Sequence, residues 1–207
     1  MNTSIIAKKN IKNRTRKAMS NSQVETYKLV ASPFHLDVRG KLSMGVLGKH
    51  LLNCADAYAA ERGFDVVEQG GEHYTWVLSR LAIELEDLPS CHESFSIQTW
   101  VENVYRLFAD RNFVICNKDE KPIGYVRSVW AMISMETRNP ANLLGLYGDR
   151  ITNSICEKEC PIAKPGRIKV SQQEAVSEYV AKYSDLDING HVNSIKYIEH
   201  ILDIFPL

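Results

Sequence analysis

A short internal repeat is the feature that most constrains the fold of this chain. Residues 30–43, VASPFHLDVRGKLS, align with residues 180–193, VAKYSDLDINGHVN, at an offset of 150 positions. Five aligned positions hold the same residue type, and at the same offset His50 aligns with His200. Each segment has the pattern of a strand that enters a turn and leads into an apolar-striped helix. The repeat therefore predicts a duplicated strand–turn–helix unit.

The two copies differ beyond the helix. In the first copy, Ser43 can cap a helix that Gly63 can end, and apolar side chains recur between them every three or four residues. Strand patterns then occupy 74–86, 95–101, 111–117 and 123–135, and NKDEKP at 117–122 predicts a hairpin turn. This order predicts an α+β fold in which one long helix and a curved antiparallel sheet bury each other.

The pattern divides the chain into four segments. We expect a basic, disordered extension at 1–22, a first domain at 23–138, and a linker at 139–169 that contains Pro161, Pro165 and Gly166. Residues 170–207 are expected to begin a second domain with a strand at about 174–183, the polar turn and an apolar-striped helix. By comparison with the first copy, this second domain would be incomplete, since its sheet would be missing.

Charge and cysteine usage exclude several classes of protein. Residues 1–22 hold six basic residues and no acidic one, which leaves 19 basic against 25 acidic residues in the remainder. An acidic body argues against nucleic-acid binding. No apolar run approaches the roughly 20 residues of a membrane span. The five cysteines form no disulfide or zinc framework, which favours reduced thiols and a cytoplasmic location.

A polar cluster opens the second helix. Residues 185–193 contain two aspartates, two asparagines and a histidine. DLDING matches the start of a calcium-binding EF-hand loop, but the twelfth position holds Lys196 where a bidentate glutamate is needed. Helix capping explains one short polar side chain but not His191 and a second carboxylate.

Hydrolytic chemistry accounts for the cluster better than calcium binding or capping. A helix that starts near Gly190–His191 would offer free N–H groups and a positive dipole end to a developing oxyanion. A neighbouring carboxylate can activate water or attack directly, and asparagine and histidine can orient the reacting groups. The chain has no Gly-x-Ser-x-Gly motif. The cluster therefore favours acyl transfer to water.

The same residues resemble the signature of a known family. YSDLDINGHVNSIKYIEHIL (183–202) is similar to the Asp-x-Asn-x-His-Val-Asn motif and apolar helix of the acyl-acyl-carrier-protein thioesterases. Three further stretches resemble that family's first-domain strands: WVLSRLAIELEDLP, SIQTWVENVYRLFADRNF and YVRSVWAMISMETRNP. The resemblance implies tandem hot-dog domains, with an acyl-chain tunnel in the first and the catalytic residues Asp187, Asn189 and His191 in the second. Single-domain hot-dog acyl-CoA thioesterases share Asp-x-Asp-x-x-Gly-His and also point to Asp187.

The resemblance also implies the activity, which is hydrolysis of the thioester of fatty acyl-acyl carrier protein to release a free fatty acid. The implied partner is an acyl carrier protein, no metal or organic cofactor is required, and a homodimer is left open. An acyl-CoA thioesterase and a truncated, non-catalytic acyl-binding relic are the alternatives. Asp187 would serve as the nucleophile or as a base, and a further acidic residue is expected on strands beyond the helix.

The first copy is expected to be non-catalytic, because Arg39 and Lys41 stand where the second copy has Asn189 and His191. Asp37 therefore lacks the helpers that Asp187 has. Three tryptophans lie in predicted strands and are expected to pack in the core or to line the acyl tunnel: Trp76, Trp100 and Trp130.

Overall fold

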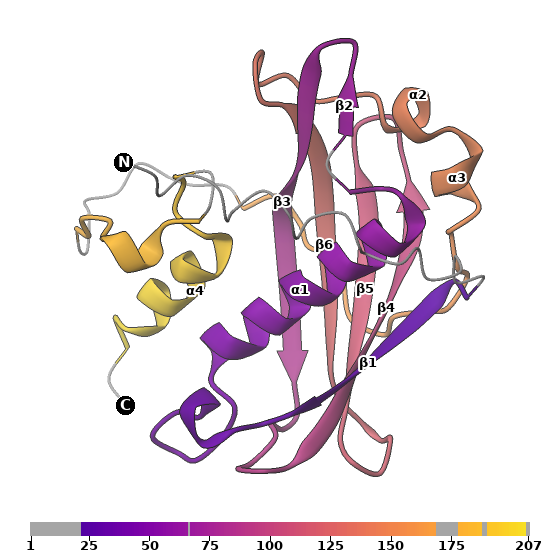
Figure 1. Ribbon diagram of the computed structural model, residues 1–207. Coiled ribbons are helices and arrows are strands. Elements are labelled where there is room, and N and C mark those ends of the chain that lie inside the picture. Colours follow the sequence, from indigo (N-terminus) through magenta and orange to yellow (C-terminus); the bar gives the residue numbers. More distant parts are fainter. Residues whose placement is uncertain (1–21, 66, 169–177, 188–189, 206–207) are drawn as a thin grey trace, which may run out of the picture.

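The computed structural model describes residues 22–65, 67–168, 178–187 and 190–205. Six strands form one antiparallel sheet in the order β1-β4-β5-β6-β3-β2. The strands are β1 (Val24–Val30), β2 (Val67–Gln69), β3 (Glu72–Leu85), β4 (Ser94–Val104), β5 (Ala109–Cys116) and β6 (Pro122–Ser134). Helix α1 (Met44–Arg62) lies across one face of this sheet (Figure 1). A long helix wrapped by an antiparallel sheet is the hot-dog arrangement, so the α+β prediction is confirmed.

Local sequence sets both ends of α1. The Ser43 side chain accepts a hydrogen bond from the Val46 N–H at 3.3 Å, which satisfies one of the free donors at the helix start. Gly63 ends the helix with a φ of 70°, a left-handed conformation that glycine adopts without a steric penalty. The helix predicted between Ser43 and Gly63 is thus confirmed.

The inner face of the sheet and α1 bury each other. Leu47, Leu51 and Ala55 of α1 pack against Phe95, Ile97, Phe113, Ile115 and Val126 of the sheet in one apolar cluster. A second cluster continues along the helix to Tyr58 and Ala59. These elements, α1 and the six-stranded sheet, form the first unit of the chain. Because burial is worth about 1.5–3 kcal/mol for each large apolar side chain, the helix–sheet contact stabilises this unit strongly.

The segment predicted as a linker is more ordered than expected. It contains α2 (Leu143–Tyr147) and α3 (Asp149–Thr152). It then crosses the outer face of the sheet, where Cys160 and Ile162 pack with Trp100, whose Nε1 donates a hydrogen bond to the Lys158 carbonyl at 2.9 Å. Helices of four or five residues are too short to show a periodicity, which is why the sequence did not reveal them.

The predicted hairpin between β5 and β6 is confirmed. The Asn117 side-chain carbonyl accepts hydrogen bonds from the N–H groups of Asp119 and Lys121, each at 3.0 Å. Glu120 completes the turn with a positive φ of 59°. Strand β2, by contrast, has only three residues and was not predicted.

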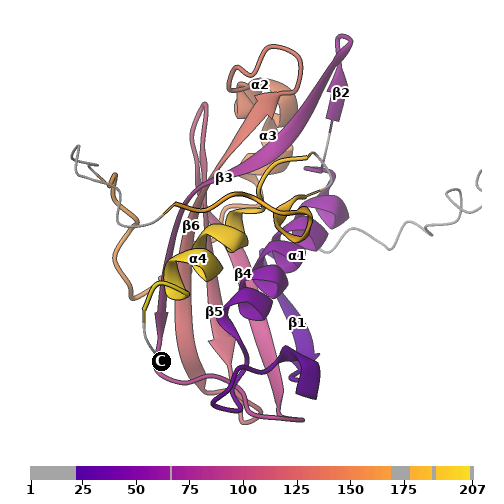
Figure 2. The same cartoon turned by 90° about the vertical axis from the view of Figure 1, so that its left-hand side faces the viewer.

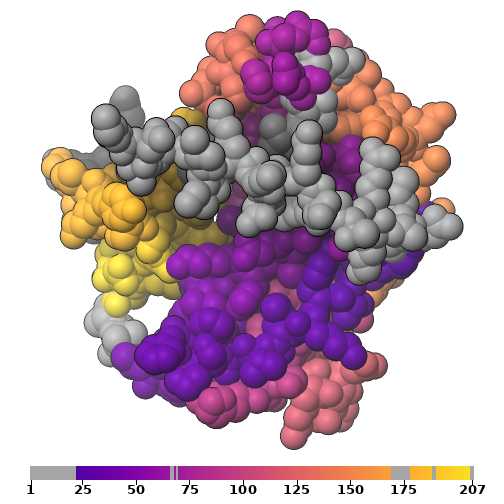
Figure 3. Space-filling view, viewed as in Figure 1, coloured from indigo at the N-terminus to yellow at the C-terminus, as the bar shows by residue number. Residues whose placement is uncertain are grey.

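The second unit consists of a 3-10 helix, η2 (Tyr183–Asp185), a tight turn and α4 (Ser194–Leu202). Helix α4 lies beside α1 (Figures 1 and 2), and in the space-filling view the second unit lies against the first (Figure 3). The contact depends on glycines of α1, since a Cβ atom on Gly48 would lie 2.6 Å from Cδ1 of Ile195. Ile195 is 1% exposed. Small residues on α1 therefore let α4 approach closely.

The apolar stripe of α4 is only partly covered. Ile195 is buried, whereas Ile201, Leu202 and Phe205 are 56%, 46% and 64% exposed. The strand expected at about 174–183 is absent from residues 178–182, and 174–177 lie outside the described residues. The predicted disordered extension, apart from Ser22, also lies outside them.

Candidate active site

The polar turn of the second unit is held by its own backbone. The Asp187 N–H donates to the His191 carbonyl at 2.8 Å, and the Gly190 N–H donates to the Asp187 carbonyl at 3.1 Å. Gly190 has a φ of 75°, which favours glycine. The His191 N–H also donates to Asp187 Oδ1 at 3.0 Å. This bond ties the Asp187 carboxylate to the residue that carries the histidine ring.

The first unit repeats this turn. The Asp37 N–H donates to the Lys41 carbonyl at 2.8 Å, and the Gly40 N–H donates to the Asp37 carbonyl at 3.0 Å. Gly40 has a φ of 73°, and the Lys41 N–H donates to Asp37 Oδ1 at 3.3 Å. Both turns also come after a 3-10 helix, which in the first unit is η1 (Pro33–His35). The repeat seen in the sequence is therefore a structural repeat.

The side chains make the two turns chemically different. In the first turn, Arg39 Nη2 and Nε donate to Asp37 Oδ2 at 2.6 and 2.9 Å. These hydrogen bonds from the Arg39 side chain hold the pKa of Asp37 below its usual value. An adjacent guanidinium thus occupies this carboxylate. The equivalent of Arg39 in the second turn is Asn189, a predicted catalytic residue that lies outside the described residues.

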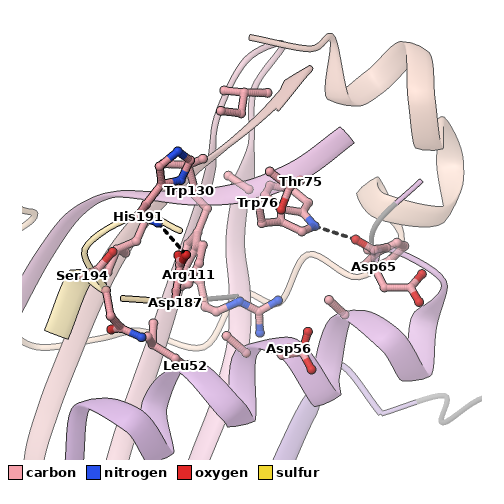
Figure 4. Close-up of a pocket in the computed structure, with 18 of the residues that line it drawn as sticks. Leu52, Asp56, Asp65, Thr75, Trp76, Arg111, Trp130, Asp187, His191 and Ser194 are labelled. Carbon is pink, nitrogen blue, oxygen red and sulfur yellow. Dashed lines mark hydrogen bonds between the residues drawn. The ribbon is translucent and has the colours of Figure 1, made fainter. Parts of the chain in front are cut away.

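The second turn borders a cavity of about 550 Å³ that the first unit builds. Asp187, His191 and Asn193 contribute to its lining, and Figure 4 shows Asp187 and His191 joined by their hydrogen bond beside it. The other lining residues come mainly from α1, β3, β5 and β6. The structure thus brings two of the three predicted catalytic residues to one cavity, although they are far in sequence from the residues that form its walls.

Most of the cavity wall is apolar. It includes Leu52, Ala55, Phe64, Val77, Ile133 and Ile151. Trp76 and Trp130 line the cavity. Trp100 is instead fully buried and packs on the outer face of the sheet. The tryptophans therefore divide between the two expected locations, the cavity wall and the core. An apolar pocket with a few polar groups at one side is typical of a small-molecule site.

A buried cation interrupts the apolar wall. Arg111 on β5 is 7% exposed, and its Nη1 donates to Thr99 Oγ1 at 3.2 Å. Its guanidinium carbon lies 4.2 Å from the centroid of the Tyr58 ring. Burial lowers the pKa of Arg111 to about 10, so the group stays charged at neutral pH. Figure 4 shows it in the same cavity as Asp187. Sequence reasoning missed this residue, since a lone arginine in a strand pattern gives no signal of its cavity.

Helix α4 starts later than the sequence suggested. The expected start was near Gly190–His191, but the helix begins at Ser194, and the Asn193 side chain caps it by accepting from the Ile195 N–H at 3.0 Å. The residues before it belong to the turn because Gly190 has a positive φ that does not fit a helix. The positive end of α4 therefore lies just beyond His191 and still beside the cavity.

The two aspartates of the motif have separate surroundings. Asp185 is 2% exposed and accepts hydrogen bonds from Tyr179, Lys182 and His200, whereas Asp187 lies at the cavity. The alignment of His50 with His200 was the one sequence signal for the group of residues around Asp185. Its partners could not be assigned from sequence.

The fold and the site together define a hot-dog protein whose second unit carries a polar turn at the first unit's cavity. Residues 21–147 match the family model of the acyl-ACP thioesterase N-terminal domain, and residues 168–207 match that of the acyl-ACP thioesterase C-terminal domain. The chain therefore belongs to the acyl-ACP thioesterase family.

Individual relatives agree with this assignment. An acyl-ACP thioesterase from Bacteroides thetaiotaomicron, solved by crystallography, is 60% identical with a TM-score of 0.82, over 91% of this chain and 76% of that one. The chloroplastic palmitoyl-acyl carrier protein thioesterase of Gossypium hirsutum is 26% identical over 75% of this chain and 39% of its own length. The chain thus spans about two fifths of that curated relative.

A smaller protein shows the same fold. A DHNA-CoA thioesterase from Staphylococcus aureus, 18% identical, superposes with a TM-score of 0.56 over 63% of this chain and 87% of its own. At this identity the similarity concerns the fold alone. Within the described residues, none of the helices is long and apolar enough to cross a bilayer.

Proposed function

We propose that this protein hydrolyses the thioester of fatty acyl-acyl carrier protein and releases a free fatty acid. The observation that carries the proposal is that Asp187 and His191 lie together at a largely apolar cavity of about 550 Å³. An acyl chain would lie in the cavity, and the thioester would lie at the turn. The acyl-ACP thioesterase family and the relatives named above support the choice of substrate.

In the proposed reaction, a water oxygen bonds to the thioester carbonyl carbon and the carbon–sulfur bond breaks. The sulfur of the phosphopantetheine arm leaves with the bonding electron pair and takes up a proton, and the acyl group leaves as a fatty acid. His191 and Asp187 supply the polar groups at the carbonyl, and Asn189 is proposed as the third member of the set. The N-terminus of α4 adds a positive dipole end near the developing oxyanion.

Two chemically distinct roles are proposed as alternatives for Asp187. As a general base it would take a proton from the attacking water, and as a nucleophile it would form a mixed anhydride with the acyl group. A single turnover in ¹⁸O-labelled water detects the anhydride route when water attacks the aspartyl carbon, and hydroxylamine trapping detects the anhydride whichever carbon water attacks. If water attacks the thioester directly, the released fatty acid carries the label in the first turnover. If Asp187 attacks first and water then attacks the aspartyl carbon of the anhydride, the label enters the protein.

The test of the function is the release of free thiol from a panel of acyl-acyl carrier proteins and acyl-CoAs of varied chain length. We expect release from carrier-bound chains to exceed release from the matching acyl-CoA. Faster release from acyl-CoA would replace the proposal with the acyl-CoA alternative, and no release from any substrate would overturn the enzyme proposal for this chain.

Two further proposals concern surroundings and assembly. The five cysteines are free thiols, three of them buried, which supports a reducing cytoplasmic location. The exposed apolar end of α4 supports self-association as a homodimer. Sedimentation over a range of protein concentrations tests the second point, since a constant monomer mass would contradict it.

A further inference from the structure

A polar cluster lies behind the candidate active-site turn, away from the cavity. Asp185, at the end of η2, is 2% exposed. Its Oδ2 accepts hydrogen bonds from the Tyr179 hydroxyl and the Lys182 N–H, each at 2.8 Å, and its Oδ1 lies 3.2 Å from His200 Nε2. The Tyr179 and His200 rings lie against each other with their centroids 3.8 Å apart. A buried carboxylate requires such partners, because an unpaired one is costly to remove from water.

This cluster joins the two arms of the turn. Tyr179 and Lys182 precede the turn, Asp185 enters it, and His200 lies in α4, beyond its exit. The Asp185 carbonyl also accepts a hydrogen bond from the Asn193 N–H at 2.8 Å, so backbone and side chain close the same loop. Asp187 and His191 lie between these closures. Their position against the cavity therefore depends on how the arms are held.

The turn of the first unit is held by different contacts. The positions that match Asp185 and His200 are His35 and His50, whose ring centroids lie 5.6 Å apart. The first unit thus places a histidine where the second unit has the Asp185 carboxylate. That turn is anchored by apolar packing instead, because Leu42 is fully buried in the main core. The matching packing is weaker in the second unit, where Val192, the counterpart of Leu42, is only partly buried. Leu186, the counterpart of the partly buried Leu36, is 46% exposed. The polar cluster thus takes the place of a core anchor.

We propose that Asp185 and His200 are positioning residues, which hold the turn so that Asp187 and His191 keep their place at the cavity. This role rests on the thioesterase function proposed above. The backbone N–H of Lys182, the Tyr179 hydroxyl and His200 keep the pKa of Asp185 below its usual value, so the carboxylate is ionised at neutral pH. The pair contributes no group to the reaction itself.

The first measurement is independent of activity. In Asp185→Asn, amide hydrogen exchange at Asp187 and His191 should speed up by about tenfold or more, because both N–H groups are donors within the turn. The amides of α1 should keep their protection. His35→Asn, the matched change in the first unit, should leave exchange at Asp187 and His191 as in the wild type.

The second measurement separates positioning from binding. Asp185→Asn should lower kcat of thioester hydrolysis by about ten- to hundredfold, as expected for a displaced catalytic group, with little change in KM. His35→Asn should leave kcat unchanged. His200→Gln keeps a side-chain donor for Asp185 and should retain more activity than His200→Ala. If Asp185→Asn does not fold, the two His200 variants carry the same comparison.

The outcomes distinguish this proposal from the function on which it rests. If the wild type hydrolyses no thioester but Asp185→Asn loosens the turn, the function fails and the structural role of the pair stands. Unchanged exchange at Asp187 and His191 in Asp185→Asn would overturn the proposal. An equal loss of kcat in His35→Asn would also overturn it, since the effect would then come from stability alone.

Discussion

The turn at Asp37–Lys41 and the turn at Asp187–His191 share their backbone hydrogen bonds, and the corresponding distances differ by at most 0.1 Å for the two main-chain bonds. They differ in what surrounds the carboxylate. Arg39 covers Asp37 and Lys41 pairs with Asp87 at 2.8 Å, whereas Asp187 and His191 line a cavity. The turn is therefore a common backbone scaffold, and the residues at two of its positions distinguish the carboxylate covered by Arg39 from the carboxylate at the cavity.

The cavity and the polar turn beside it come from different units. The first unit supplies the cavity walls through α1 and the sheet, and the second supplies the polar turn. They meet where Gly48 of α1 accepts Ile195 of α4. A site assembled from both units depends on their relative placement as much as on its own residues.

The largest expected effect tests the division of labour directly. Asp187→Ala and His191→Ala should each lower turnover by about a hundredfold or more, as removal of acid–base or positioning groups does. Asp37→Ala should leave turnover unchanged, because its carboxylate belongs to the turn without a histidine. Thiol release from an acyl carrier protein measures all three. An equal loss in a folded Asp37→Ala variant would show that the two turns share the chemistry.

The next effect concerns the contact between the units. Gly48→Ala places a Cβ 2.6 Å from Cδ1 of the buried Ile195, and overpacking of this kind costs about 1–3 kcal/mol. Hydrogen exchange should show α4 losing protection while the centre of α1 keeps it. Adding Ile195→Ala should recover part of the loss in a double-mutant cycle. Purely additive effects would mean that the two residues do not meet as described.

A matched pair of glycine variants then compares the turns themselves. Gly40→Ala and Gly190→Ala each force alanine to a positive φ, at 73° and 75°, with no atom within 4 Å of the new Cβ. Each should destabilise its turn by about 1–2 kcal/mol through backbone strain alone. Only Gly190→Ala should lower turnover. Denaturant unfolding measures the destabilisation, and thiol release measures turnover. A fall in turnover for Gly40→Ala would contradict the expectation that only the second turn takes part in the reaction.

The smallest effect concerns the pairing of Asp37. Hydrogen bonds from Arg39 lower its pKa in the folded protein, so the pair stabilises the fold above the unfolded pKa, and this contribution is lost as pH falls through the folded pKa. Arg39→Gln should raise the pKa of Asp37 toward its ordinary 3.8. The loss in free energy of unfolding at neutral pH should be smaller than that of either glycine variant, since Arg39 is largely exposed and salt screens the pair.

Carboxyl titration by NMR measures that pKa, and Lys41→Gln is the control. The Lys41 side chain pairs with Asp87, and only its backbone N–H donates to Asp37. Its replacement should therefore leave the Asp37 titration in place. A shift as large as that of Arg39→Gln would assign the lowered pKa to the general charge of the turn.

Local features were predictable because their causes are local. Ser43 and Gly63 bound a helix through groups within one turn of its ends, and Asn117 forms its hairpin turn with residues four positions away or fewer. The apolar alternation of β4 reads directly as one buried face. The repeat itself could be seen because the turn needs a carboxylate and a glycine at fixed spacing, whatever surrounds it. Short elements such as β2, α2 and α3 carried too few residues to show a pattern.

The amino-acid sequence by itself determined the two units, the family and the residue types of the candidate catalytic turn. Only the tertiary structure decided that Asp187 and His191 face a cavity walled by α1 and the sheet, that Arg111 is buried beside the same space, and that Asp185 turns away to His200. These relations join residues that are far apart in the chain or lie on different elements. They depend on how α4 packs on α1, which a glycine and a buried isoleucine set through contact in space rather than through sequence spacing.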